Sequence, residues 1–206
     1  NFKIIYGYLS LCMLILYYLA RIHYGHEVLA FIVFSMMVSG IVSAVVDAGC
    51  SKYLSRLVAE TGITQNLYAR SFITLYYIFA LIWFLLVVLF YDWFTPTWFK
   101  SDVKDPTIDH ITVISFLSLG SFSILNLGIN SVGVGSGDFN KQSIIAASNG
   151  TISYVPLIIF ILLGGELHFL GYALVFGKIV HILIAIFLFK NSHLGFLFKP
   201  ALLISN

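Results

Sequence analysis

Long uncharged stretches set the pattern of hydrophobic and polar positions along this chain. Five stretches contain no Asp, Glu, Lys or Arg, and a sixth is interrupted only by Lys178. They cover residues 4–20, 28–46, 71–91, 111–137, 142–165 and 167–189. A helix needs about 20 apolar residues to cross the hydrocarbon core of a bilayer. The pattern therefore predicts six membrane-spanning helices.

Two other architectures predict different patterns. A surface helix of a soluble protein carries a charged face with a period of 3.6 residues, which these stretches lack. A strand of a membrane barrel alternates polar and apolar residues, whereas residues 81–90 are apolar throughout. We expect an all-α, polytopic membrane protein with a six-helix bundle in residues 1–190. Residues 191–206 are expected to form a cytoplasmic connection and the start of a seventh helix.

Composition leads to the same class. The 206 residues are 60% hydrophobic and only 10% charged, against about 45–50% and about 25% in soluble domains. The 11 Lys and Arg residues are dispersed and the net charge is only +2, so the dense basic patch that a nucleic acid requires is missing. Cys12 and Cys50 have no metal-ligand or redox spacing. We therefore expect no nucleic-acid partner, metal or cofactor.

The basic residues predict the orientation, because cytoplasmic loops are enriched in Lys and Arg. Ten of them lie outside the predicted spans. Seven fall on the side that holds both ends of the chain: Lys3, Lys52, Arg56, Arg70, Lys141, Lys190 and Lys199. Three fall on the opposite side: Arg21, Lys100 and Lys104. Both ends are therefore predicted to be cytoplasmic, and residues 92–110 to form the longest outer loop.

Lys178 is the one charged residue near the middle of a predicted span, with eleven uncharged residues on each side. A Lys at that depth costs about 2.5–3.5 kcal/mol on insertion scales. His181 follows three residues later and shares its helical face. Lys178 is thus a candidate for a cationic lining that receives an anionic substrate, or for a group that titrates during transport. The alternative is a structural pair with a carboxylate such as Asp47 or Asp138.

Two stripes of small and polar residues lie on single helical faces. One contains Ser123, Asn126, Asn130 and Gly133, and the other contains Ser35, Ser39, Ser43 and Asp47. Such stripes let helices approach closely and form hydrogen bonds, or they line a hydrophilic cavity. Pro156 is expected to kink its helix, because proline removes a backbone donor. No loop gathers a nucleophile with a base and a third group, so we expect no enzyme.

A short motif follows the second predicted span. Asp47-Ala48-Gly49 is followed by Lys52, Arg56 and Ala59-Glu60, and Gly25-His26-Glu27 precedes the span. This pattern resembles the polysaccharide (O-antigen and capsule) flippases of the Wzx type, within the multidrug/oligosaccharidyl-lipid/polysaccharide exporter superfamily. The segment from Gly137 to Gln142 also resembles the loop between helices 4 and 5 of those proteins.

The resemblance implies twelve or fourteen helices in two bundles, of which this chain supplies the N-terminal one. It implies a flippase that moves a polyprenyl-pyrophosphate-linked oligosaccharide across the bacterial inner membrane by alternating access. Membrane lipid and other polysaccharide-assembly proteins are the further partners expected. The candidate cavity residues are Lys178, His181, Asn126 and Asn130. The candidate cytoplasmic-end residues are Asp47, Gly49, Lys52 and Arg56.

Three other functions stay open from the sequence. An ion-coupled small-molecule or drug antiporter of the same superfamily favours acidic residues deep in the membrane, whereas here the mid-span charge is Lys178. A polysaccharide polymerase or ligase needs a catalytic outer loop, and residues 92–110 form a short one. A structural membrane subunit would need no charge in mid-span.

Overall fold

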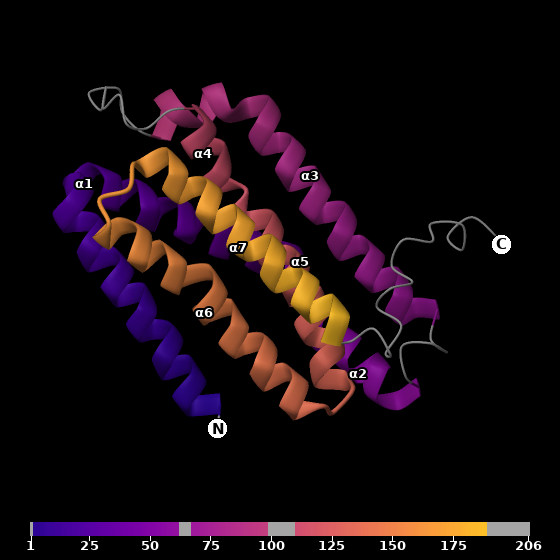
Figure 1. Cartoon of the computed structure of the whole chain (residues 1–206). Coiled ribbons are helices and arrows are strands. Elements are labelled where there is room, and N and C mark those ends of the chain that lie inside the picture. The colour runs from indigo at the N-terminus through magenta and orange to yellow at the C-terminus, as the bar shows by residue number, and fades with distance from the viewer. Residues whose placement is uncertain (1, 62–66, 99–109, 189–206) are drawn as a thin grey trace.

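The computed structural model describes residues 2–61, 67–98 and 110–188, and every element in these ranges is a helix. The elements are α1 (Phe2–Asp47), α2 (Cys50–Thr61), α3 (Leu67–Trp98), α4 (His110–Leu117), α5 (Leu119–Gly135), α6 (Phe139–Leu162) and α7 (Leu167–Leu188) (Figure 1). Five stretches are long and apolar enough to cross a membrane: Gly7–Asp47, Ser71–Tyr91, His110–Gly135, Phe139–Leu162 and Phe169–Leu188. The all-α prediction is therefore confirmed.

Helix α1 folds back on itself at Gly25. This residue has φ 89° and ψ −177°, which are not helical values. The Tyr17 hydroxyl donates a hydrogen bond to Met36 Sδ at 2.9 Å, although 19 residues of straight helix would separate the two residues by about 28 Å. We call residues 2–24 the first arm of α1 and residues 26–47 the second arm. The two arms contain the first two helices that the sequence predicts.

The described connections lie at two ends of the bundle (Figure 1). At one end α2 packs on α5, where Ser55 Oγ donates to the Ser131 carbonyl at 3.0 Å. At the other end the Tyr24 hydroxyl donates to the Gly165 carbonyl, which joins the turn of α1 to the α6–α7 connection. The turn of α1 and the α6–α7 connection thus lie together at one end, and α2 lies at the other.

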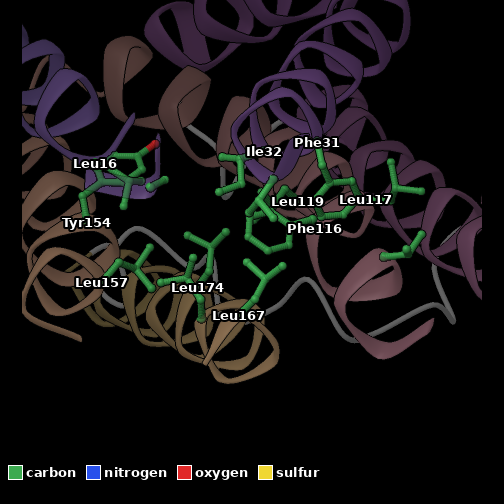
Figure 2. Close-up of a cluster of buried hydrophobic side chains, with 14 of the residues drawn as sticks. Leu16, Phe31, Ile32, Phe116, Leu117, Leu119, Tyr154, Leu157, Leu167 and Leu174 are labelled. Carbon is green, nitrogen blue, oxygen red and sulfur yellow. The ribbon is translucent and has the colours of Figure 1, made fainter. Parts of the chain in front are cut away.

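The interior of the bundle is a cluster of buried apolar side chains. Figure 2 shows Leu16, Phe31 and Ile32 from the two arms of α1 near Phe116, Leu157 and Leu174 of α4, α6 and α7. The rings of Phe31 and Phe116 meet edge to face with centroids 5.2 Å apart. The outer side of α3 is also apolar, since Leu81, Leu85 and Leu89 are exposed. An apolar interior combined with an apolar outside is expected in lipid, where water is absent.

One predicted boundary was wrong, and one predicted span is divided into two helices. Helix α3 continues to Trp98 with a non-helical residue at Phe90 (φ −117°, ψ 15°), so residues 92–98 are helical and not loop. The predicted span 111–137 is two helices, because Ser121 N donates to the Ser118 carbonyl. That bond leaves the Leu117 carbonyl to accept from Trp83 Nε1 at 2.9 Å. Residues 99–109 of the predicted outer loop and the predicted connection 191–206 lie outside the described residues.

Candidate functional site: a polar cavity around Lys178

Lys178 lies on α7 and reaches across to α6. Its Nζ donates a hydrogen bond to Asn149 Oδ1 at 2.7 Å and lies 5.1 Å from the centroid of the Tyr154 ring. Asn149 Oδ1 also accepts from Ser153 Oγ at 3.3 Å. The ammonium is therefore held by an amide oxygen and an aromatic face, both of which are electrically neutral.

A glycine beside Lys178 lets the two helices come close. A Cβ atom on Gly177 would lie 2.8 Å from the Ile152 carbonyl oxygen and 3.1 Å from Ser153 Cα, so only glycine fits without a shift of the backbone. Pro156 lies four residues after Ile152 and has no N–H to donate to that carbonyl. Helix α6 nevertheless runs continuously through Pro156 from Phe139 to Leu162.

The alternative interpretation of Lys178, an ion pair with Asp47 or Asp138, was wrong. Asp138 lies between α5 and α6 and contacts Lys141 Nζ at 2.7 Å. This hydrogen bond holds the pKa of Asp138 below its ordinary value, and the backbone N–H of Lys141 adds a second donor. Asp47 accepts from Tyr76 and Ser51 at the end of α1. Both carboxylates therefore have partners away from Lys178.

His181 lies one turn after Lys178 and joins three helices. Its Nδ1 is 3.0 Å from Ser148 Oγ of α6, and its Nε2 is 3.3 Å from Asn126 Oδ1 of α5. The residue is only 1% exposed. The prediction that His181 shares a face with Lys178 is confirmed, and Asn126 lies in the same cluster.

Two adjoining cavities share Lys178, Tyr154 and Ser123. The first, which we call the His181 cavity, has a volume of about 150 Å³ and is lined by Phe122, Ser123, Asn126, Asn149, Tyr154, Lys178, His181 and Ile182. The second, which we call the Ser39 cavity, has a volume of about 180 Å³ and is lined by Met13, Met36, Ser39, Gly40, Leu119, Ser123, Tyr154, Leu174 and Lys178. Lys178 thus lies between a chamber among α5, α6 and α7 and another that the arms of α1 help to enclose.

The electrostatics of these cavities favour a negative group. Among the residues that the structure describes, no Asp or Glu lines either cavity. The Ser39 hydroxyl, in a residue that is 5% exposed, has no hydrogen-bond partner in the described part of the chain. A buried hydroxyl without a partner costs free energy, and a positive charge in a low-dielectric interior attracts an anion strongly. An anionic group with several acceptor oxygens has the chemistry to satisfy Lys178 and Ser39.

The other predicted cavity residue lies elsewhere. Asn130 is exposed and lines neither cavity. Sequence reasoning missed Ser148, Asn149 and Tyr154. The available signal was a short polar group, Ser148, Asn149 and Ser153, inside the apolar run that became α6.

The motif residues at the end of α1 form a separate junction. The Asp47 carboxylate accepts from Ser51 N and Ser51 Oγ, both at 2.8 Å, and from the Tyr76 hydroxyl at 2.6 Å. It therefore caps the start of α2 and connects it with α3. Gly49 has φ 90°, a left-handed conformation that favours glycine, and allows the chain to turn between α1 and α2.

The basic residues of the motif point to solvent. Arg56 Nε donates to Glu60 Oε1 at 2.8 Å, whereas Asp47 accepts from Ser51 and Tyr76. This exposed pair raises the pKa of Arg56 above its ordinary value, because Glu60 accepts its hydrogen bond and attracts its charge. Lys52 is exposed on the same helix. Lys52 and Arg56 thus add positive charge to this end of the bundle.

The apolar helices define a multi-pass membrane protein. Comparisons with protein-family models, with curated proteins and with solved structures found no match for this chain. Within the described ranges, no group of three or more His, Cys, Asp and Glu side chains lies in a position to hold a metal ion.

Proposed function

We propose that this chain is part of a transporter that moves an anionic, lipid-linked oligosaccharide across the bacterial inner membrane. The observation that carries the proposal is the position of Lys178 between two cavities that no described acidic residue lines. A phosphoryl group is a strong partner for a Lys ammonium. The family resemblance of the Asp47–Glu60 segment adds the lipid-linked sugar as the particular substrate.

The proposed topology has six crossings. The apolar part of α1, Gly7–Asp47, has 41 residues, about twice the number that one crossing requires. Because α1 folds back at Gly25, each arm supplies one crossing, and the other four apolar stretches supply one each. We place the α2 end in the cytoplasm, since Lys52, Arg56 and Lys141 lie there and cytoplasmic loops favour Lys and Arg.

The cavity volumes constrain how such a substrate is handled. A water molecule occupies about 30 Å³ in the liquid, so cavities of about 150 and 180 Å³ have room for one phosphoryl or carboxylate group and not for a sugar chain. In this conformation the cavities offer a site for one anionic group. Alternating access rocks one bundle against another, so we place the path of the glycan between this bundle and the second bundle that the resemblance implies.

The volumes of the two cavities also favour a second candidate function. A transporter of a small organic anion would use the cavities at their present size, with Lys178 as the charge partner. The two functions differ in whether the sugar chain is needed for transport, which a competition experiment with a free organic phosphate decides.

The proposed function is tested in the host cell by replacing Lys178. We expect Lys178→Ala to lower surface polysaccharide at least tenfold while the protein stays inserted and abundant. Arg21→Ala is the matched control, because it removes an exposed charge near the Gly25 turn of α1. It should leave the polysaccharide unchanged. Normal polysaccharide with Lys178→Ala at normal abundance would rule out the cavity as the substrate path.

A further inference from the structure

Ser148 contacts the imidazole of His181, a group that can bind a proton and that lies one turn from Lys178. The Ser148 hydroxyl has one hydrogen but faces two groups able to accept it. Its Oγ lies 2.8 Å from the Ile145 carbonyl oxygen and 3.0 Å from His181 Nδ1. If the hydrogen points to Ile145, the lone pairs of Ser148 Oγ face Nδ1, and Nδ1 must then carry a proton to complete the bond.

The other ring nitrogen also faces an acceptor. His181 Nε2 lies 3.3 Å from Asn126 Oδ1. An imidazolium therefore finds an acceptor for each of its two N–H groups, while Ser148 keeps its bond to the Ile145 carbonyl. The neutral ring is held as well, with Nε2–H donating to Asn126 and the Ser148 hydroxyl turned to Nδ1. The two protonation states thus differ by one proton on Nδ1 and by one rotation of the Ser148 hydroxyl.

The charge around His181 decides between these states. On α7 the neighbouring charged group is Lys178, one turn away. The described lining residues are uncharged on α5 (Phe122, Ser123 and Asn126), and on α6 the only titratable one is Tyr154. A proton on His181 is therefore repelled by Lys178 when the cavity is empty. An oxyanion beside Lys178 cancels that repulsion and attracts the proton.

We propose that the His181 cavity binds an oxyanion and a proton together, with Lys178 holding the anion and His181 taking up the proton from solvent. The oxyanion is a phosphoryl or carboxylate group. The inference rests on the anion-binding part of the proposed function and not on the identity of the transported lipid. Because linkage between two ligands is reciprocal, the proton must strengthen anion binding as much as the anion strengthens proton binding.

Sulfate is the appropriate probe, since it is an oxyanion that does not itself titrate near neutral pH. The purified full-length protein, in weakly buffered detergent solution with a pH indicator, is titrated with sulfate between pH 6 and pH 8. We expect up to one proton to be taken up per sulfate bound. We also expect affinity to rise by up to about tenfold for each unit by which the pH falls.

Three variants separate the possible outcomes. His181→Gln should bind sulfate without proton uptake and without pH dependence, whereas His23→Gln, which alters an exposed histidine, should behave as the unaltered protein. Ser148→Ala should reduce uptake, because it removes one acceptor of the imidazolium. Each variant is first checked for helix content and monodispersity.

Four results would overturn the inference, and they have different consequences for the proposed function. Sulfate binding without proton uptake in the unaltered protein, or equal uptake in His181→Gln, refutes coupling and leaves the anion site intact. Failure of the unaltered protein to bind sulfate at all refutes both the coupling and the anion site. Binding that persists unchanged in Lys178→Met places the anion elsewhere and also refutes both.

Discussion

Lys178 of α7 donates a hydrogen bond to Asn149 of α6 at 2.7 Å, so the mid-span cation is held by an amide and not by a carboxylate. An amide oxygen accepts a hydrogen bond from the ammonium but leaves its charge uncancelled. A carboxylate would accept the hydrogen bond and also cancel the charge. The charge of Lys178 thus remains available to a ligand in the two cavities.

The first prediction follows from this difference. Asn149→Asp should leave the protein at least as abundant, because the new carboxylate pairs with Lys178. Sulfate binding and polysaccharide export should nevertheless fall at least tenfold, because the cavity loses its net positive charge. Calorimetric titration measures the binding, and staining of surface polysaccharide measures export.

A companion variant controls for loss of the amide itself. Asn149→Ala should lower the free energy of unfolding by about 1.5–3 kcal/mol, the range for a hydrogen bond to a charged group, and should retain part of the anion binding. If Asn149→Asp bound sulfate as strongly as the unaltered protein, the charge of Lys178 would not be the attraction.

The second prediction concerns the approach of α6 and α7 at Gly177. In Gly177→Ala the new methyl group would lie 2.8 Å from the Ile152 carbonyl oxygen, and a backbone atom cannot rotate away. The free energy of unfolding should fall by about 1–3 kcal/mol, as for other overpacked interiors. Gly7→Ala is the control, because its Cβ would meet nothing within 4 Å. Unfolding midpoints in a detergent titration compare the two, and equal midpoints would contradict the close approach.

How far the sequence predicts the site depends on whether a feature is local. A run without charge predicts a helix in lipid regardless of its neighbours, so the uncharged runs of the described ranges became helices. Lys178 could be singled out because its cost in mid-span is also local. Asn149 could not, because its role depends on how α6 is rotated against α7. Asn130 shares the face of Asn126 but lies about 6 Å further along α5, is exposed and lines neither cavity.

The third prediction concerns the junction at Asp47. Tyr76→Phe removes the hydroxyl that donates to Asp47 at 2.6 Å and keeps the ring that packs in the second apolar cluster. We expect a loss of about 1.5–3 kcal/mol in the free energy of unfolding, because the hydroxyl donates to a charged group. Protease accessibility of α2 should increase, since Asp47 connects that helix with α3. Tyr18→Phe, at an exposed position on the first arm, should change neither quantity. A result in which Tyr76→Phe matches Tyr18→Phe would mean that the Ser51 bonds alone hold the junction.

The last prediction tests the reversal of α1 in the membrane. In a background with Cys12→Ser and Cys50→Ser, a single cysteine replaces either Arg21 or Lys52, both of which are exposed. If each arm crosses once, the two positions lie on opposite sides of the membrane, although only 31 residues separate them in the chain. A membrane-impermeant maleimide added to intact spheroplasts should label the cysteine at position 21 and should label the one at position 52 only after lysis. Labelling of both positions before lysis would place them on one side and rule out the six-crossing topology, whereas labelling of position 52 alone would keep six crossings and invert the proposed orientation.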